Sequence, residues 1–476
     1  MNDLRKNYIY NVIYQVLLFI TPLITAPYVA RTIGAEGIGV YSYSYSIAYY
    51  FYIFGMLGVT NFGNRCIARV QRDFDKRTEE FWNLYIIQMI LGLILTGLYC
   101  LYVAFSVKNN QKIFWLQIFV PLSAVFDISW FFFGMEEFRI TVPRNILLKI
   151  LNVVLMLLIV KQKADLWKYT LLLSLIIIAT HLALWPYLPK FIGKPKLSLH
   201  KIAANIKPDL ILFIPVLAIS LYKVMDKIML GKMCDPAQVG FYENAEKVIN
   251  IPNGLITAFS TVMLPRMSAY FADGDDHTAF SLIRKSSEFM MFLSCALAFG
   301  LCGIAVEFTE VFYGQGFEQS AVLIKIIAIT IIAQALGTVM RSLFLIPKGK
   351  DNCYIWSIFA GAGINLVLNS ILIPIYEAKG AAIATMISEF VVMFVQLYFV
   401  QKELPMTKYI FRGSKYVVIG IIMILILGNI HIHDEFATVV VKVLIGGGFY
   451  LLLSSIVSCR RSVALFNKLI HTIRRL

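Results

Sequence analysis

Long apolar runs separated by short polar loops constrain this chain more than any other feature. A run of about twenty mainly apolar residues crosses the roughly 30 Å hydrocarbon core of a bilayer as an α-helix. Of the 476 residues, 59% are hydrophobic and 15% are charged, whereas soluble domains carry about 25% charged residues. Membrane β-barrels show short alternating segments instead of long apolar runs. We therefore predict an all-α polytopic membrane protein.

Measured against that length, the sequence contains about fourteen candidate transmembrane helices. The predicted spans are 8–30, 37–63, 81–106, 113–133, 145–160, 166–189, 208–230, 239–265, 282–304, 319–346, 353–375, 381–400, 414–430 and 437–458. The short loops leave no room for a nucleotide-binding domain, and the sequence has no GxxxxGK[ST] phosphate loop. We predict a transporter that is not an enzyme, without a catalytic residue, a cofactor or a metal site.

Basic residues gather in alternate loops and give the chain a net charge of +15. The segments richest in Lys and Arg are 65–77, 190–207, 402–415 and 460–475, whereas the predicted outer loop 305–318 contains neither residue. Short cytoplasmic loops of membrane proteins carry such an excess. The pattern predicts that both termini are cytoplasmic. It also explains the positive charge without a nucleic-acid partner.

The two halves of the chain show traces of a duplication. Gly39-Val40-Tyr41 matches Gly240-Phe241-Tyr242 at an offset of 201 residues, and Arg65 matches Arg266 at the same offset. Internal repeats of this kind are common in transporters. An even number of helices in each repeat relates the two lobes by an axis along the membrane normal.

The duplication predicts three parts. An N-terminal lobe of six helices covers 1–200, and a C-terminal lobe of six helices covers 201–402. The last part, 403–476, contains two extra helices and a basic cytoplasmic tail.

Ionisable residues cluster in two predicted spans. The span 208–230 carries Lys223, Asp226 and Lys227, which share one helix face because their spacing is i, i+3, i+4. The span 239–265 carries a second group, formed by Glu243, Glu246, Lys247 and Asn250. Glu389, in the span 381–400, is a third charged position.

Charged groups at membrane depth usually face a bundle interior or a watery cavity. The interpretation we favour is a wet central cavity whose lysines bind an anionic head group. In the first alternative, the acids and lysines form a network that only joins the two helices. In the second, the lysines extend to the outer interface.

The second predicted span begins with alternating tyrosines and serines, YSYSYS. Tyr41 and Tyr45 are candidates for stacking on sugar rings, although tyrosines near an interface are most often membrane-belt residues. Pro22 and Pro27 are predicted to interrupt the first span.

Two blocks of the sequence resemble polysaccharide flippases of the Wzx type. Residues 22–65 read PLITAPYVARTIGAEGIGVYSYSYSIAYYFYIFGMLGVTNFGNR, and residues 222–268 read YKVMDKIMLGKMCDPAQVGFYENAEKVINIPNGLITAFSTVMLPRMS. The resemblance places the chain in the MOP superfamily (multidrug, oligosaccharidyl-lipid and polysaccharide transporters). It implies a V-shaped bundle of two six-helix lobes with two extra helices.

The resemblance also implies a function. Members move undecaprenyl-pyrophosphate-linked oligosaccharides from the inner to the outer leaflet of the cytoplasmic membrane, by alternating access. The family's cavity charges correspond here to Lys223, Asp226 and Lys227, and less directly to Glu243, Glu246 and Lys247. Expected partners are this lipid, the bilayer, a coupling ion (H⁺ or Na⁺), and a polysaccharide polymerase with other assembly proteins. O-antigen, capsule and teichoic acid all remain open as the polymer.

Three alternatives remain open. A cation-coupled multidrug exporter of the MATE type would use Asp226 or Glu243 as its cation or proton site and would not need the lysines. An integral membrane enzyme of glycan assembly would need a catalytic constellation at the membrane face, which the short loops disfavour. A scaffold subunit would not explain charges inside the spans.

Overall fold

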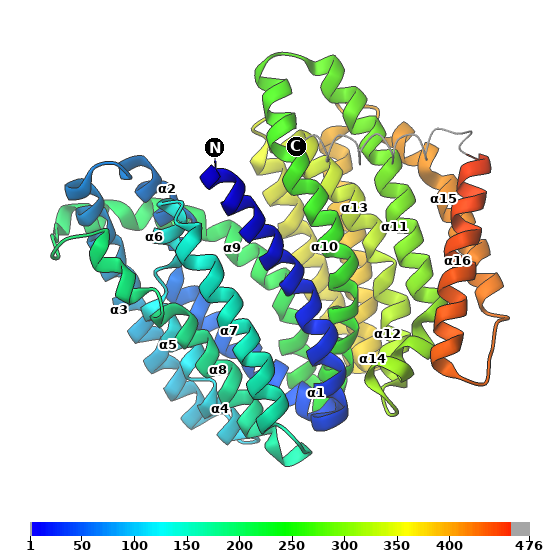
Figure 1. The fold of residues 1–476 in the computed structure, drawn as a ribbon, viewed down its shortest axis with the longest axis horizontal. Coiled ribbons are helices and arrows are strands. Elements are labelled where there is room, and N and C mark those ends of the chain that lie inside the picture. The colour runs from blue at the N-terminus through cyan, green and yellow to red at the C-terminus, as the bar shows by residue number, and fades with distance from the viewer. Residues whose placement is uncertain (1, 458–476) are drawn as a thin grey trace. The chain divides into compact units, whose positions relative to one another are not determined.

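The computed structural model describes the backbone of residues 2–457 and the side chains of residues 21–457 except Tyr222. Every regular element of the described chain is a helix (Figure 1). The predicted all-α fold is therefore confirmed. The basic segment 460–475 lies outside the described residues.

Contacts divide the chain into two compact units, Met1–Gly240 and Phe241–Leu476. The elements of the first unit are α1 (Asn2–Met56), α2 (Val59–Val70), α3 (Phe74–Ser106), α4 (Gln111–Leu116), α5 (Phe119–Phe126), α6 (Ser129–Gly134), α7 (Phe138–Ile159), η1 (Lys163–Asp165), α8 (Leu166–Leu182), η2 (Trp185–Lys190) and α9 (Leu199–Met233). The helix α9, which the duplication assigns to the second half, packs against α1, α2 and α3. The lobe boundary at residue 200 stays a prediction.

The helix α10 (Pro236–Ala272) begins at the end of the first unit and continues into the second. The remaining elements are α11 (Asp276–Tyr313), α12 (Glu318–Ala328), α13 (Thr330–Met340), the π-helical turn η3 (Arg341–Leu345), α14 (Asp351–Val400), α15 (Met406–Leu427) and α16 (Glu435–Val457). The segment 305–318 is not an outer loop throughout, because α11 continues to Tyr313.

Eleven helices or helix groups in the described chain are long and apolar enough to cross a membrane. One of them, α14, covers both of the predicted spans 353–375 and 381–400. The helix α1, which is not among the eleven, covers the span 8–30 and most of 37–63. The count of fourteen is not confirmed and stays a prediction.

Two long helices are broken by residues with positive φ. In α1 the break lies at Gly34 (φ 79°), a conformation that glycine adopts without a steric penalty. In α14 it lies at Glu377 (φ 52°). The prediction that Pro22 and Pro27 interrupt the first span is wrong, because α1 stays helical through both prolines. Prolines are tolerated in spans where neighbouring groups satisfy the freed backbone.

The core of the first unit is aromatic. Phe81 and Tyr85 of α3 stack with their ring centroids 5.6 Å apart, and Trp130 of α6 stacks on Phe81 at 5.5 Å. Trp185 meets the edge of Tyr85 at 5.3 Å. These rings fix α3 against α6 and the start of η2.

The two glycines matched by the duplication lie in reciprocal contacts within the first unit. A Cβ on Gly39 would lie 1.7 Å from the carbonyl oxygen of Pro236, and a Cβ on Gly240 would lie 1.9 Å from that of Ala35. Residues 35 and 236, like 39 and 240, are 201 positions apart. Reciprocal contacts between equivalent residues are the pattern that a two-fold axis produces. Glycine is required because the two backbones touch.

In the second unit, α11 packs against α12, α13, α15 and α16. Two glycines of α15, seven residues apart, allow the close approach. A Cβ on Gly413 would lie 2.6 Å from Met291, and one on Gly420 would lie 2.1 Å from the Phe299 ring. Small residues at helix interfaces allow backbones to pack closely in membrane proteins.

Aspartates begin one long helix in each unit. The Asp73 side chain accepts a hydrogen bond from the Lys76 backbone N–H before α3, at 3.0 Å. The Asp275 side chain accepts one from the Thr278 N–H before α11, also at 3.0 Å. Such N-caps satisfy amide groups that the first helical turn leaves without a partner.

Candidate functional site

The three ionisable residues predicted on α9 lie in the first unit. Asp226 is buried, at 3% exposure, whereas Lys227 is partly buried and Lys223 is exposed. Their i, i+3, i+4 spacing on a continuous helix places them on one face, as predicted. A buried acid therefore lies next to two more accessible cations.

This part of α9 packs on the tyrosine-rich half of α1. A Cβ on Gly231 would lie 2.2 Å from the Tyr43 ring, so the two helices touch closely there. The Tyr50 hydroxyl donates to the Ser220 carbonyl oxygen at 3.2 Å. Asp226 interacts electrostatically with Tyr50, and Lys227 interacts with Tyr49. The predicted charges thus face a row of phenol side chains.

Four other rings of α1, of which Tyr49 interacts with Lys227, stack in series; we name Tyr41, Tyr45, Tyr49 and Tyr52 the tyrosine row. Successive centroids lie 5.8, 5.8 and 5.9 Å apart, with interplanar angles of 15°, 19° and 17°. The row follows one face of α1 because its spacing is i, i+4, i+8, i+11. All four side chains are partly exposed. The sequence prediction included the first two rings and missed the continuation to Tyr52.

The group predicted on α10 lies in the second unit. Lys247 Nζ lies 3.4 Å from Glu243 Oε1, an ion pair within one helix. Glu246 is partly buried and Asn250 is exposed. The α9 and α10 groups therefore belong to different compact units, and their meeting in one cavity stays a prediction.

Glu389, the third charged position, lies in the second half of α14 and is largely buried. Gln334 of α13 donates from Nε2 to Glu389 Oε1. This acid therefore connects α13 with α14 within the second unit.

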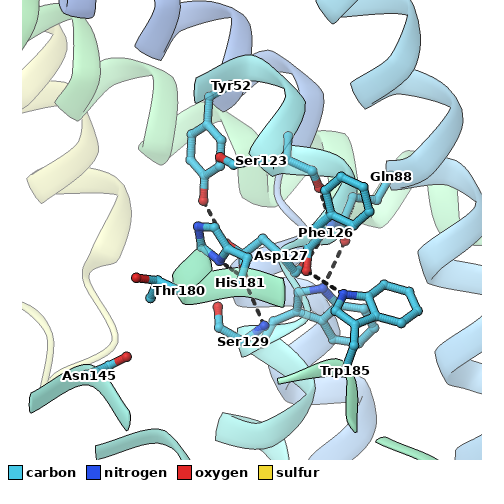
Figure 2. Close-up of polar contacts among 12 residues, drawn as sticks. Tyr52, Gln88, Ser123, Phe126, Asp127, Ser129, Asn145, Thr180, His181 and Trp185 are labelled. Carbon is cyan, nitrogen blue, oxygen red and sulfur yellow. Dashed lines mark hydrogen bonds and ion pairs between the residues drawn. The ribbon is translucent and has the colours of Figure 1, made fainter. Parts of the chain in front are cut away.

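A polar cluster of the first unit surrounds Asp127, between α5 and α6 (Figure 2). The Tyr52 hydroxyl donates to Asp127 Oδ2 at 2.7 Å, and the Ser129 backbone N–H donates to Oδ1 at 2.9 Å. His181 Nδ1 of α8 lies 3.1 Å from Oδ1. Asp127 is 3% exposed, yet three donors surround its carboxylate. We name Tyr52, Asp127 and His181 the carboxylate–imidazole cluster.

A second layer of hydrogen bonds holds the backbone beneath this cluster. Gln88 of α3 donates from Nε2 to the carbonyl oxygens of Ala124 and Asp127, at 2.6 and 2.7 Å. Trp130 Nε1 donates to Gln88 Oε1 at 2.9 Å. Trp185 Nε1 donates to the Phe126 carbonyl oxygen at 3.0 Å (Figure 2). These bonds fix the non-helical stretch around Asp127, which orients its carboxylate.

The sequence analysis missed this cluster, although one signal was available. His181 is the only histidine within the fourteen predicted spans. Ionisable residues inside spans mark functional positions by default. The partners could not be found in the same way, because Tyr52 and Asp127 lie 129 and 54 positions before it.

The second unit contains a different buried pair. Lys442 Nζ of α16 lies 2.6 Å from Glu307 Oε1 of α11. Lys442 is 2% exposed and Glu307 is 7% exposed. The prediction missed the pair because it placed Glu307 in an outer loop. Two buried opposite charges at this distance compensate each other.

A further carboxylate is buried in the first unit. Asp209 of α9 is fully buried, and neither of its oxygens accepts a hydrogen bond from a described side chain. The backbone of Gly58, just before α2, contacts Asp209 and is its one backbone donor among the described residues. Asp209 thus lacks the donors that surround Asp127.

Among the described residues, no group of three or more His, Cys, Asp or Glu side chains could hold a metal ion.

The comparisons with known proteins agree with the fold. A family model described as "Polysaccharide biosynthesis protein" matches residues 4–271, more than half of the chain. The chain is 25% identical over 406 residues to a protein of Escherichia coli K12 named "Putative O-antigen transporter", covering 84% of this chain and 97% of that protein. It is 27% identical over 170 residues to "Probable low-salt glycan biosynthesis flippase Agl15" of Haloferax volcanii, covering 35% of each.

Two solved structures have a similar fold. The lipid II flippase MurJ, in an inward closed conformation, superposes with a TM-score of 0.74 at 16% identity, over 94% of this chain and 98% of that one. A MOP superfamily transporter of Pyrococcus furiosus superposes with a TM-score of 0.52 at 14% identity, over 83% of this chain and 96% of the other.

Proposed function

The chain belongs to the family of polysaccharide biosynthesis proteins, and from this premise we propose that it moves undecaprenyl-pyrophosphate-linked oligosaccharide units from the inner to the outer leaflet of the cytoplasmic membrane. The family match confirms the resemblance to polysaccharide flippases. The similarity to an O-antigen transporter over 97% of its length carries the proposal. The homologues are transporters and flippases, not enzymes.

Within this proposal, Lys223 and Lys227 bind the pyrophosphate. Both are more accessible than Asp226, which balances their charge. Hydrogen bonds between ammonium groups and phosphate are stronger than neutral ones. Tyr41 and Tyr45 contact the sugars. A second set of head-group contacts comes from α10, where we propose Glu243, Glu246, Lys247 and Asn250.

The proposed orientation has both termini in the cytoplasm, which the basic loops support. The anionic head group then moves outward by alternating access. An inside-negative potential favours this direction by about 2.3 kcal/mol per charge per 100 mV. A coupling ion, H⁺ or Na⁺, is a second source of energy.

Proteoliposomes that contain the purified chain and a fluorescent undecaprenyl-pyrophosphate oligosaccharide test the proposal. We expect protein-dependent movement of the lipid to the opposite leaflet. The double variant Lys223→Gln/Lys227→Gln should lower the rate by about tenfold or more, because each hydrogen bond to a charged group is worth about 1.5–3 kcal/mol.

Lys232→Gln is the matched control, because Lys232 is an exposed lysine near the end of the same helix. Its rate should equal that of the wild type. A normal rate in the double variant would overturn the role of the lysines, and no lipid movement by the wild type would overturn the function. If the double variant no longer folds, the two lysines are structural.

A cation-coupled multidrug exporter is the second candidate, supported by the buried acid Asp226, which interacts with Tyr50 of α1. It predicts transport of a cationic dye driven by a proton or sodium gradient. Asp226→Asn would abolish that transport, while the lysine variants would retain it.

A further inference from the structure

We propose that the carboxylate–imidazole cluster of Tyr52, Asp127 and His181 is a proton-binding site whose occupancy is coupled to transport. The proposal rests on the function proposed above and names its coupling ion. The ligand is a single proton, which His181 binds and releases. No bond other than N–H forms or breaks.

The geometry gives Asp127 and His181 different roles. The carboxylate of Asp127 is surrounded by three donors, namely the Tyr52 hydroxyl, the Ser129 N–H and His181 Nδ1. These donors favour the ionised form of a carboxyl group. Asp127 is therefore the acceptor of these bonds, and we assign the bound proton to the imidazole.

The proton enters and leaves at Nε2 of His181. The Nδ1 atom faces the carboxylate, and a neutral imidazole carries its one hydrogen on the nitrogen that donates. No described side chain forms a hydrogen bond with Nε2. The imidazole side chain is 15% exposed. Among side chains, histidine is the one whose charge ordinarily changes between about pH 5 and 8.

The other groups around His181 keep their charge over this range. From α1 come Tyr52 and, behind it, Tyr49 and Tyr45. Gln88 of α3 is neutral and bonds to the backbone. Thr180 is bonded to the Ile176 carbonyl oxygen.

The helix α7 packs against α8, and its Asn145 is labelled in Figure 2. The Arg144 Nη2 atom donates to Asn145 Oδ1 at 2.6 Å. Arginine keeps its proton at any of these pH values.

A change in the charge of His181 affects its own helix α8, the α5–α6 segment and α1. Protonated His181 forms an ion pair with Asp127, which strengthens the link from α8 to the α5–α6 segment. Tyr52 joins both residues to α1, through its hydrogen bond and through its ring, whose centroid lies 6.3 Å from that of the imidazole. The tyrosine row then continues from Tyr52 to Tyr49, which interacts with Lys227. Contiguous contacts thus connect the proton site with a proposed head-group residue.

His181→Gln tests the proposal in proteoliposomes with an imposed pH gradient. Glutamine keeps a donor for Asp127 but binds no proton in this pH range. We expect the gradient to change the rate of lipid movement by the wild type about fivefold or more, a typical coupling between two sites. The variant should move lipid at one rate with and without the gradient. His200→Gln, an exposed histidine of α9, should respond like the wild type.

A response of His181→Gln equal to that of the wild type would overturn the proposal while leaving the flippase function intact. A wild-type rate of lipid movement that does not change with the pH gradient would also overturn the proposal. If the wild type moves no lipid, the proposed function fails, and a second measurement still tests the proton site.

That measurement is NMR of the full chain in detergent with isotope-labelled histidines, which needs neither transport nor the glutamine variant. Tyr52→Phe removes one hydrogen bond from the carboxylate but keeps the histidine. We expect one imidazole signal to respond to Tyr52→Phe and to change with pH. If no signal responds, or the responding signal does not titrate, the proton site is overturned.

Discussion

The two compact units bury charge in different ways. The second unit buries a lysine and a glutamate, Lys442 and Glu307, in direct contact. The first unit buries an aspartate, Asp127, against a histidine, a tyrosine and a backbone N–H. Both arrangements satisfy a carboxylate at membrane depth. Only the first contains a partner whose charge ordinarily changes near neutral pH.

The Lys442–Glu307 pair is a fixed connection between two helices, whereas the strength of the Asp127–His181 contact depends on whether a proton is bound. A Lys–Glu pair with little exposure on either side joins α16 to α11 by a direct contact between full charges. A His–Asp pair with a partly exposed imidazole has two states of different strength. We infer that the pair of the second unit is structural and that the cluster of the first unit is functional.

The largest expected effect is the loss of stability caused by Lys442→Met. This change leaves the Glu307 carboxylate buried without its counter-charge. Breaking a buried pair in this way costs about 3–5 kcal/mol. Thermal and denaturant unfolding of the purified protein in detergent should show a large decrease in its midpoint.

The double variant Lys442→Met/Glu307→Leu sharpens this prediction. It removes both charges and should recover most of the lost stability, because apolar side chains of similar size often replace a buried ion pair at little cost. Recovered protein should retain lipid movement. A recovered fold without transport would show that the pair is functional and would remove the difference between the units.

The next expected effect is that of Asp127→Asn. The amide retains one acceptor but places an NH₂ group among donors, so at least one buried donor loses its partner. Leaving one buried group unsatisfied costs about 1–3 kcal/mol. The unfolding midpoint should decrease less than in Lys442→Met. The response of transport to a pH gradient should disappear.

Asp209→Asn is the matched control for this substitution. Asp209 is as buried as Asp127, but no described side chain donates to it. Asparagine keeps an oxygen that can accept from the Gly58 backbone and removes a charge that no side chain compensates, so we expect the unfolding midpoint to stay the same or increase. A decrease as large as that of Asp127→Asn would contradict the importance of the donors around Asp127.

The sequence was sufficient for the fold class and for the faces of single helices. Apolar length predicted the helices, and the i, i+3, i+4 spacing placed Lys223, Asp226 and Lys227 on one face. Local chemistry was less decisive where the chain bends. The break in α1 lies at Gly34, where φ is positive, and the helix continues through Pro22 and Pro27.

The buried polar clusters could not be predicted because their members come from distant segments. Asp127 meets Tyr52 across 75 positions, and Lys442 meets Glu307 across 135. No spacing rule connects such residues. The end of a span is equally hard to locate, since Glu307 continues a helix that hydropathy alone ended at residue 304.

The smallest expected effect concerns the two aspartate N-caps, Asp73 before α3 and Asp275 before α11. Because neither is buried, they test whether the two units resemble each other outside their buried charges. Hydrogen bonds from Lys76 lower the pKa of Asp73, and hydrogen bonds from Thr278 lower that of Asp275. A carboxyl group whose pKa is lowered on folding adds stability above its unfolded pKa, about 3.9. That stability is lost as the pH falls through the lower, folded value.

Asp73→Ala and Asp275→Ala should therefore lower the unfolding midpoint slightly at neutral pH, and the difference from the wild type should narrow below about pH 4. Asp273→Ala removes the same charge two residues from the second cap and should have no effect. Asp73 also pairs with Lys76 Nζ at 3.2 Å, so salt should reduce the effect of Asp73→Ala more than that of Asp275→Ala. Equal salt responses would mean that both caps act through the backbone hydrogen bond alone, which would make the two units alike outside their buried pairs.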